Sequence, residues 1–362
     1  MYNYFFIAIG IISGVLLFWK LPVLQQTGNS VELPQITVII PMRNEEKNIA
    51  LLLSDLMSQT FQPHEIICVD DESTDRSVAV AQARGATVLL VGKKPESWVG
   101  KSYACQLGAQ KTACKTLVFL DADVRLAPHA LSVLAFRHTA LNCTLSVQPY
   151  HRVKSFYEYF SLFSNIVLVA STGIGLPLHI KTVAFFGSVL VINHETYDEM
   201  GGHTAVKGHI LEDLMLGRHY TINHIPSWLF TGGKLISFRM YSSGFRQLWQ
   251  GWTKNIFTGA SNIPVPMLLL IVMLMTAYAT SVFVVAEAFV HGETFWCMAA
   301  VLSYIISVLQ IQAISRKLGS FSPLAAVFYP VFLVGFIVMF VVSAFKKLVL
   351  KSTKWKGRDV PL

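Results

Sequence analysis

The sequence predicts an α/β domain with a parallel sheet, joined to an N-terminal anchor helix and to C-terminal transmembrane helices. Three observations support this fold class. Expected strands and helices alternate between residues 35 and 234, which is typical of a parallel sheet with helices on both faces. Long apolar stretches follow residue 262. Hydrophobic residues make up 53% of the 362-residue chain and charged residues only 14%, which is too apolar for an ordinary soluble domain.

The net charge of the chain is +8 at pH 7. In a membrane protein such an excess usually marks cytoplasmic anchoring residues. Nucleic-acid binding is disfavoured, because no expected helix carries a concentrated basic stripe. The five cysteines form no C-x-x-C pair, so we expect reduced thiols in a domain that faces the cytosol.

The stretch from Tyr4 to Trp19 is almost wholly apolar and ends at Lys20. A secretory signal is one interpretation. No basic residues precede the stretch and no small-residue cleavage site follows it, which favours an uncleaved transmembrane anchor within residues 1–24. A polar linker, residues 25–34, leads into the next domain.

The central domain, residues 35–262, alternates expected strands with expected helices. Its first helix is the clearest, because Ile49, Leu52 and Leu56 recur at helical spacing. Ligands bind at the carboxyl ends of the strands in such sheets, so we expect a site there. The expected strands are residues 36–40, 65–69, 86–91 and 116–120, and the expected helices are residues 44–59, 77–84 and 103–112.

Three apolar stretches within residues 263–345 are long enough to cross a bilayer, which requires about 20 residues. They are residues 267–289, 295–314 and 323–345, and a basic tail of residues 346–362 follows. Three crossings after a cytosolic domain would place this tail outside, whereas basic segments favour the inside. Two alternatives stay open: residues 323–345, which contain Pro330, are re-entrant, or one span is miscounted.

The apolar segment from Phe156 to Val191 is rich in aromatic residues but is interrupted by glycines, Pro177, His179 and Lys181. A span interrupted in this way would leave backbone groups unsatisfied in lipid. We therefore expect this segment to lie in the membrane interface rather than to cross the bilayer.

Asp121 and Asp123 directly follow the expected strand 116–120. Residues two apart in an extended chain point to the same side, and carboxylates so close repel each other unless a cation lies between them. Mg²⁺ and Mn²⁺ take carboxylate oxygens and leave positions open for phosphates. A surface turn is the alternative, because Asp is common in turns. The apolar strand and two companion clusters favour a metal site.

Two other polar clusters fall at expected strand ends. Asp70 and Asp71 could accept hydrogen bonds from a ribose or a pyrimidine, whereas Ser73 or Asp75 could cap the next helix. In the segment 41–46, Asn44 is expected to cap a helix that has two acids in its first turn. The start of the same loop is also expected to contact a nucleotide base.

Glu212 and Asp213 precede an expected helix. They are either helix-start residues or the source of a general base that takes a hydroxyl proton. Nearby histidines follow no H-x-x-x-H or H-E-x-x-H pattern, so we expect polar loop and surface residues and no metal site among them. These are His194, His203, His209, His219 and His224.

Four motifs in this order, VIIPMRNEEKNI, VDDESTDRS, FLDADV and LEDLMLG, resemble those of family 2 inverting glycosyltransferases. The resemblance covers about residues 36–255 and implies the GT-A fold, a Rossmann-like fold that binds nucleotide sugars. The segments SWVGKSYA, RMY, GWTKN and WKGR resemble a membrane-bound subgroup. That subgroup includes bacterial carotenoid-acid glycosyltransferases and hopanoid-cluster enzymes.

The resemblance implies a donor pocket for the uracil and ribose of a UDP-sugar, lined by Pro41, Glu45, Asp70 and Asp71. It further implies that Asp121 lies near the ribose and the metal.

The same resemblance assigns the chemistry. Asp123 would ligate Mg²⁺ or Mn²⁺ against the diphosphate, and Asp213 of the Glu212–Asp213 pair would be the base. Lys101 and Trp252, in the subgroup motifs, would be further donor contacts.

One departure concerns processivity. Processive members carry Q-x-x-R-W after the base, where this chain has GWTKN at residues 251–255, which puts processive synthesis in doubt. Lys254 or Arg239 would stabilise the leaving diphosphate instead.

The function that follows is transfer of a hexose, expected to be glucose, to a lipid-soluble acceptor such as a carotenoid carboxylate. Polyprenyl phosphate, diacylglycerol and hopanoid acceptors are alternatives, as is a catalytically silent membrane scaffold. Residues 156–191 would line the acceptor path. We expect a multi-pass protein of the cell membrane with its catalytic domain in the cytoplasm and no nucleic-acid partner.

Overall fold

The computed structural model describes residues 2–25, 32–98, 100–177, 184–209, 211–291, 294–350, 352–355 and 358–361. The chain divides into two compact units. The sheet unit comprises Pro22–Tyr150 and Lys181–Arg239. The helical unit comprises Met1–Leu21, His151–Ile180 and Met240–Leu362.

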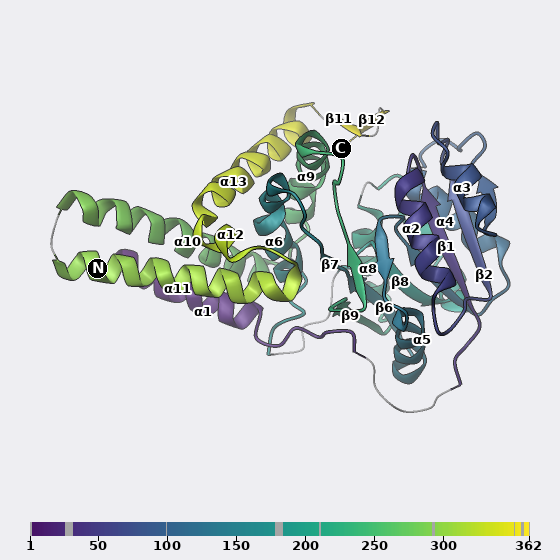
Figure 1. The fold of residues 1–362 in the computed structure, drawn as a ribbon, viewed down its shortest axis with the longest axis horizontal. Helices are drawn as coiled ribbons and strands as arrows, with labels where there is room; N and C mark the ends of the chain where they lie inside the picture. Colours follow the sequence, from purple (N-terminus) through teal and green to yellow (C-terminus); the bar gives the residue numbers. More distant parts are fainter. Residues whose placement is uncertain are drawn as a thin grey trace. The chain divides into compact units, whose positions relative to one another are not determined.

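A seven-stranded sheet in the order β3-β2-β1-β4-β8-β6-β9 forms the centre of the sheet unit (Figure 1). Strands β3, β2, β1 and β4 are parallel, β8 is antiparallel to both neighbours, and β6 is parallel to β9. A second sheet has the order β5-β10-β7. The bounds are β1 Ile36–Met42, β2 Glu65–Asp70, β3 Thr87–Leu90, β4 Thr116–Leu120, β5 Val124–Leu126, β6 Thr144–Gln148, β7 Tyr150–His151, β8 Val189–Asn193, β9 Ser227–Thr231 and β10 Ile236–Phe238.

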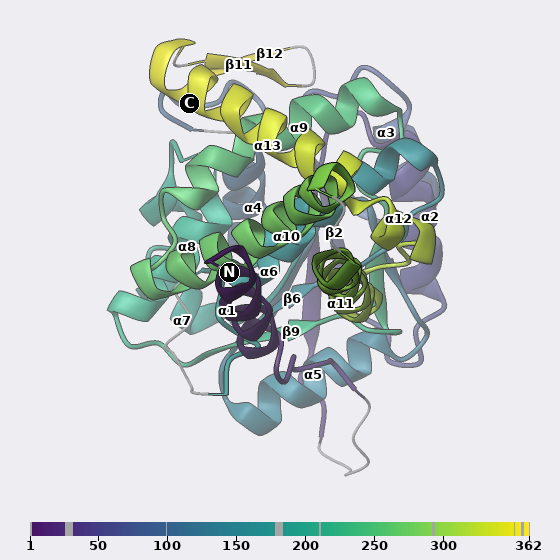
Figure 2. The same cartoon turned by 90° about the vertical axis from the view of Figure 1, so that its left-hand side faces the viewer.

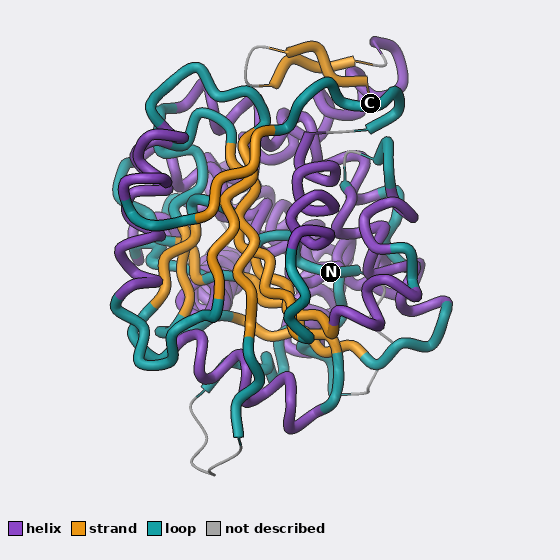
Figure 3. Tube along the Cα trace, turned by 90° about the vertical axis from the view of Figure 1, so that its right-hand side faces the viewer, coloured by secondary structure: helices purple, strands orange, loops and turns teal. Residues whose placement is uncertain are grey.

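Helices cover both faces of the larger sheet, as the alternation of elements predicts (Figure 3). On one face, side chains of α2, α3 and α5 share a hydrophobic core with alternate strand residues such as Val38 and Val118. On the other face α4 packs against β1 and β2, where Gly108 lies against Ile39. The bounds are α2 Glu46–Met57, α3 Ser77–Ala83, α4 Gly100–Lys111, α5 Ala130–Leu141, α7 His194–Glu199, η2 Gly202–Val206 and α8 Glu212–Ile222.

The antiparallel strand β8 departs from the expected parallel sheet. Its first residues, Val189 to Val191, end the segment predicted to lie in the membrane interface, yet they are at most 1% exposed. The prediction is wrong for these residues, because a strand buried on both faces is a continuous apolar run that resembles an interfacial segment. His179 and Lys181, which interrupt that segment, lie outside the described residues.

The helical unit contains the rest of that apolar segment as η1 and α6. Leu162, Phe163 and Ile166 of α6 are fully buried, whereas Phe156 of η1 is 69% exposed. Position at the membrane interface stays a prediction. The elements of the unit are α1 Tyr2–Leu17, η1 Phe156–Ser161, α6 Leu162–Ser171, α9 Phe245–Ala260, α10 Val265–His291, α11 Thr294–Leu318, α12 Pro323–Val327, α13 Tyr329–Phe345, η3 Lys346–Leu350, β11 Ser352–Trp355 and β12 Arg358–Pro361.

Helix α1 lies beside α10 and α11, as Figure 2 shows. The contact is close because Gly10 has no side chain: a Cβ atom there would overlap Ala277 and Met273. Gln310 of α11 donates a hydrogen bond from Nε2 to the carbonyl oxygen of Ile11 at 2.8 Å. Small residues and interhelical hydrogen bonds of this kind hold membrane helices together. The transmembrane role of α1 stays a prediction, because its 16 residues fall below the length of a full span.

Three described helices are long and apolar enough to cross a membrane: residues 265–290, 294–318 and 329–350. The first two match the predicted spans. The third, predicted as residues 323–345, is divided at Phe328 into α12 and α13. Pro330 occupies the first turn of α13, where its missing N–H costs no helical hydrogen bond. The predicted basic tail, from residue 346, begins as the continuation of that third candidate helix.

Candidate active site

Three parallel strands end at one edge of the sheet, and the predicted acids follow these ends. Met42 of β1 lies opposite Asp70 of β2, and the backbone N–H of Asp71 donates to Met42 O at 2.9 Å. Asp121 follows β4, and its N–H donates to Ser188 O at 3.0 Å, just before β8 begins. The carboxyl edge of the sheet thus gathers the ends of β1, β2 and β4 with the start of β8.

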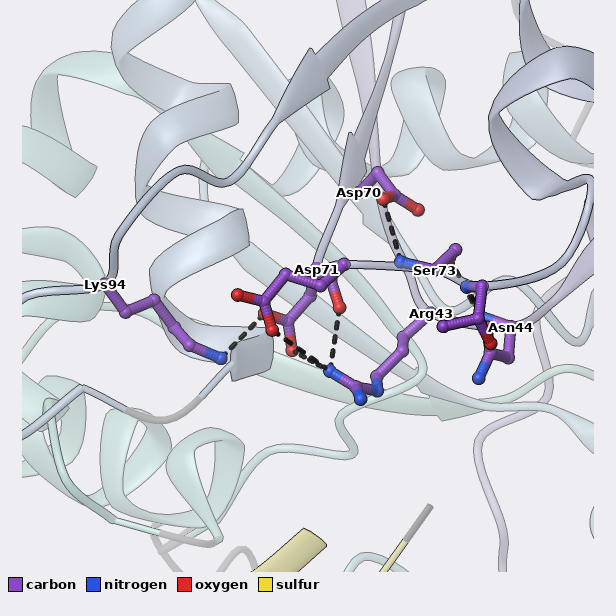
Figure 4. A network of polar contacts seen from close by, with 8 residues as sticks. Arg43, Asn44, Asp70, Asp71, Ser73 and Lys94 are labelled. Atoms are coloured by element: carbon purple, nitrogen blue, oxygen red, sulfur yellow. Dashed lines mark hydrogen bonds and ion pairs between the residues drawn. The ribbon is translucent and has the colours of Figure 1, made fainter. Parts of the chain in front are cut away.

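The first group at this edge, here called the donor cluster, comprises Arg43, Asp70, Asp71 and Lys94 (Figure 4). Lys94 Nζ contacts Asp71 Oδ1 at 2.7 Å. Arg43 Nη1 donates to the carbonyl oxygen of Asp71 at 2.9 Å and lies 3.7 Å from its Oδ2. The Asp71 side chain is only 11% exposed, so two cations compensate a largely buried carboxylate.

One oxygen of Asp70 accepts no hydrogen bond within the described part of the chain. Its Oδ2 accepts from the Ser73 backbone N–H at 3.0 Å, while its buried Oδ1 has no hydrogen bond among the described residues. Buried polar atoms are rarely left without a partner in folded proteins. This oxygen is therefore free to accept an N–H or O–H from a ligand.

The two loops that carry the donor cluster hold each other in place. Asn44 and Glu72 have φ angles of 52° and 57°, in the left-handed region that most residues avoid. Asn44 Oδ1 accepts from the Thr74 backbone N–H at 2.7 Å. The predicted cap of α2 by Asn44 is wrong, because the N-cap of α2 is Glu45 and makes no side-chain capping bond.

The second loop supplies the missing caps of α2. Ser77 Oγ accepts from the Glu45 N–H at 2.8 Å, and Asp75 Oδ2 accepts from the Glu46 N–H at 3.1 Å. Burial alone would raise the pKa of Asp75, but hydrogen bonds from Ser77 and Glu46 lower it below its usual range. Asp75 is therefore a structural acid, but the predicted cap of the next helix is wrong, because the N-cap of α3 is Arg76 rather than Ser73 or Asp75.

The second group, here called the lysine-centred cluster, comprises Lys101, Asp121, Glu212 and Asp213. Lys101 Nζ lies 2.9 Å from Asp121 Oδ1, 2.9 Å from Asp213 Oδ2 and 3.4 Å from Glu212 Oε1. It also donates to the carbonyl oxygen of Gly187 at 3.1 Å. Lys101 thus links Asp121, the acid predicted to lie near the ribose and the metal, with Asp213, the acid predicted to be the base.

Charge in the lysine-centred cluster is strongly coupled. Burial opposes the charge on Lys101, but Asp121, Asp213 and Glu212 outweigh it and hold the Lys101 pKa well above its usual range. Burial would likewise raise the pKa of Asp213, but the Lys101 ammonium holds that pKa below its usual value. At Asp121 burial prevails, and its pKa is raised. Lys101 is therefore charged and Asp213 ionised at neutral pH.

Glycine residues allow this close approach. A Cβ atom at Gly187 would overlap Asp213 Oδ2, and one at Gly100 would overlap Asp71 Oδ2. Glu212 and Asp213 lie in the first turn of α8, where the helix dipole favours negative charge. The interpretation of this pair as helix-start residues is therefore confirmed, whereas the role of Asp213 as a base stays a prediction.

The residues predicted to bind a divalent metal fit that role. Asp121 is 29% exposed in its side chain, and Asp123 is partly exposed two residues later. Within the described ranges no three His, Cys, Asp or Glu side chains form a metal-binding group. Mg²⁺ and Mn²⁺ sites in nucleotide enzymes need only one or two carboxylates, because substrate phosphates complete the coordination.

Pro41, Glu45 and Arg239 are the other predicted site residues of the sheet unit. Pro41 lies in β1 opposite Val69, and Glu45 accepts a hydrogen bond from Asn48. Arg239 ends the sheet unit. Their donor roles stay predictions.

Trp252 and Lys254 belong to α9 in the helical unit. Trp252 is 6% exposed, and its indole N–H donates to Ser161 Oγ at 2.9 Å. This contact explains the tryptophan as a packing residue of the helical unit. Its donor role and the diphosphate role of Lys254 stay predictions.

Sequence reasoning missed Lys94, Arg43 and His203. Lys94 follows β3, so the rule that ligands bind beyond strand ends already pointed to it. His203 contradicts the expected surface position: it is fully buried, its Nδ1 lies 2.7 Å from Tyr197 Oη, and burial lowers its pKa to about 4. No local pattern distinguishes this histidine from the exposed ones nearby.

Comparisons with known proteins agree with this architecture. Residues 37–214 match the family model for glycosyl transferase family 2. The chain is 33% identical over 330 residues to a 4,4'-diaponeurosporenoate glycosyltransferase of Staphylococcus aureus (strain USA300), which covers 90% of this chain and 88% of that protein. A protein of the same description from Staphylococcus haemolyticus (strain JCSC1435) is 35% identical over 332 residues, with 90% and 88% covered.

Among solved structures, the mannosyltransferase PcManGT from Pyrobaculum calidifontis, in complex with GDP-Man and Mn²⁺, shares the fold. Its TM-score is 0.53 at 16% identity, with 96% of this chain and 99% of that chain covered. The sheet with its acidic carboxyl edge defines a domain of the GT-A class. The chain belongs to glycosyl transferase family 2 and associates with membranes through its apolar helices.

Proposed function

We propose that this protein transfers a hexose, with glucose as the first candidate, from a UDP-sugar to a lipid-soluble carotenoid carboxylic acid. One observation carries the proposal: the donor cluster and the lysine-centred cluster lie at the same edge of one sheet. The name of the Staphylococcus relatives, which specifies a carotenoid acid, supports the acceptor class.

The donor cluster suits a uracil base. Uracil presents an imide N–H that a carboxylate accepts, whereas adenine and cytosine present a lone pair at the equivalent position. Asp71 offers such a carboxylate, and the unpartnered Asp70 Oδ1 offers another acceptor. Lys94 and Arg43 hold the Asp71 carboxylate in place, and its oxygens are acceptors for such an N–H.

Asp121 and Asp123 would hold Mg²⁺ or Mn²⁺, whose charge would neutralise the leaving diphosphate. Asp213 would act as the base where the acceptor has a proton to lose. The acceptor oxygen displaces the diphosphate from the anomeric carbon at the opposite face, so the configuration inverts in one step. A carotenoid carboxylate is already ionised near pH 7, so it attacks without giving a proton to Asp213.

An alcohol acceptor, such as a diacylglycerol or a hopanoid, is a second candidate with a different demand on Asp213. Its hydroxyl must lose a proton during attack. Asp213 is a weak base while Lys101 contacts it, because the ammonium lowers its pKa. This observation favours an acceptor that is ionised beforehand, which includes a polyprenyl phosphate as well as a carboxylic acid.

The experiment is a transfer assay with the purified full-length protein in detergent. 4,4'-Diaponeurosporenoate is compared with the matching carotenoid alcohol and with a polyprenyl phosphate, and UDP-glucose is compared with GDP-mannose. We expect a glycosyl ester from UDP-glucose and the acid alone, formed only with Mg²⁺ or Mn²⁺. If transfer to the alcohol or to the phosphate is faster than transfer to the acid, the proposed acceptor is wrong. Transfer that does not depend on a divalent metal would contradict the proposed metal site.

A further inference from the structure

Lys101 contacts more oxygen atoms than an ammonium group can satisfy. Three carboxylate oxygens and one carbonyl oxygen lie between 2.9 and 3.4 Å from Nζ. An ammonium has three donors, and three carboxylates around one lysine leave a net negative charge. A group of carboxylate and carbonyl oxygens is also the ligand set that hard divalent cations prefer.

The cluster has an open and a closed side. The side chains of Lys101 and Asp121 are each 29% exposed, whereas those of Glu212 and Asp213 are 7% and 14% exposed. A ligand that reaches the cluster therefore meets Lys101 and Asp121 first. Asp121 is also one of the two carboxylates proposed to hold the metal.

The position of Lys101 in the chain links the two clusters. It is the second residue of α4, directly after Gly100, which packs against the Asp71 carboxylate of the donor cluster. A nucleotide at Asp71 and a cation at Asp121 thus act on the same turn of α4. The flexible four-carbon stem of lysine allows its ammonium to move without a change in the backbone.

We propose that the Lys101 ammonium is an internal placeholder for the divalent cation. In the donor-free enzyme it binds Asp121 together with Glu212 and Asp213, and it releases Asp121 when metal and nucleotide diphosphate arrive together. The displaced ammonium then pairs with the diphosphate. This inference rests on the proposed function, because it assumes that Asp121 binds the metal.

The test measures Mn²⁺ binding to the purified full-length protein, by electron paramagnetic resonance of free Mn²⁺, with and without UDP. In the wild type we expect weak binding of Mn²⁺ alone and much tighter binding with UDP. Lys101→Met should lower the Kd for Mn²⁺ alone at least tenfold and should shrink the gain from UDP by a similar factor. Lys111→Met, which removes an exposed lysine from the last turn of the same helix, is the matched control and should leave the Kd for Mn²⁺ alone within twofold.

A purely structural lysine, or one that only binds diphosphate, gives a different result. The Kd for Mn²⁺ alone would then be the same in wild type and Lys101→Met, and the inference would be overturned. Absence of Mn²⁺ binding to the wild type with UDP would instead count against the metal site of the proposed function.

Thermal unfolding provides an independent readout. Without Lys101 the three carboxylates repel each other, so we expect Lys101→Met to have a lower Tm than the wild type in EDTA. Mn²⁺ should then raise the Tm of Lys101→Met by more than it raises the Tm of the wild type. A lowered Tm that Mn²⁺ does not restore would contradict the placeholder role. Lys101→Gln, whose amide occupies similar space, replaces Lys101→Met if the latter does not fold.

Discussion

Asp213 combines two properties that bear on its chemistry. Its side chain is 14% exposed, and one of its oxygens already accepts from Lys101. A carboxylate in this setting takes a proton poorly, and an acceptor that is already ionised does not require it to take one. The nature of the acceptor therefore decides how much of the rate depends on Asp213.

Replacing Asp213 by Asn keeps the shape of the side chain and removes its basicity. We expect about 10²–10⁴-fold slower transfer to an alcohol acceptor, since that is the usual contribution of a general base. The loss should be smaller with a carotenoid acid, which has no proton to give up. UDP affinity should stay unchanged, because Asp213 is not part of the donor cluster.

Steady-state rates with both acceptors and calorimetry with UDP measure these effects. Asp198→Asn, an exposed acid of the same unit, is the control. An Asp213→Asn rate equal to that of the wild type on the alcohol would assign the base to another residue.

Individual acids could be predicted from the sequence, whereas their partners could not. Asp70, Asp71 and Asp121 follow apolar strands, and the topology of a parallel sheet brings strand ends together. Lys101 and Asp213 are 112 residues apart, and no pattern in either segment indicates their contact. Such a pairing depends on how α4 and α8 pack, which is a property of the folded unit.

Elements with strong periodicity matched their predicted positions. Helix α2 has buried residues at Ile49, Leu52, Leu53 and Leu56, as its spacing predicts. Strand β8 escaped prediction because both of its faces are buried, which removes the alternation that identifies a strand. The turn before it, at Gly187, likewise shows no pattern in the sequence that would predict it, although it borders the lysine-centred cluster.

Gly187→Ala tests how tightly this turn is fitted. The added Cβ atom would overlap Asp213 Oδ2, so the carboxylate must move away from Lys101. We expect at least a tenfold loss of transfer rate with UDP affinity unchanged. Gly92→Ala, at a position with open space around it, is the matched control and should behave as the wild type. Equal rates for both variants would show that the cluster tolerates the displacement.

On the scale of the whole chain, the contacts of α13 bear on the side of the membrane that the basic tail occupies. Helix α10 starts next to the end of α9, and α11, which directly follows α10 and packs against it, runs back toward that level. Tyr329, at the start of α13, donates from its hydroxyl to Tyr278 O at 3.0 Å and stacks on Tyr304. Tyr278 lies 13 residues into α10, about 20 Å along the helix. Helix α13 therefore begins at mid-depth.

The other end of α13 comes back to α9. The Phe257 backbone N–H donates to Ser343 Oγ at 3.1 Å, and Lys346 Nζ donates to Thr253 Oγ1 at 2.7 Å. Helices α12 and α13 thus enter from the level of α9 and return to it (Figure 1). This arrangement favours the re-entrant alternative, and it satisfies the preference of basic segments for the cytoplasmic side.

We therefore expect the basic tail and the catalytic domain on the same side of the membrane, with the turn between α10 and α11 on the other. Single cysteines at Lys354, Glu96 and Phe295, in a background without the native cysteines, report these three positions. A membrane-impermeant maleimide should label Phe295→Cys in intact cells, and Lys354→Cys together with Glu96→Cys only in inside-out vesicles. Transfer activity of each variant confirms that it is folded. If Lys354→Cys is instead labelled in intact cells along with Phe295→Cys, α13 crosses the bilayer, and its contacts with α9 would have to break in the membrane.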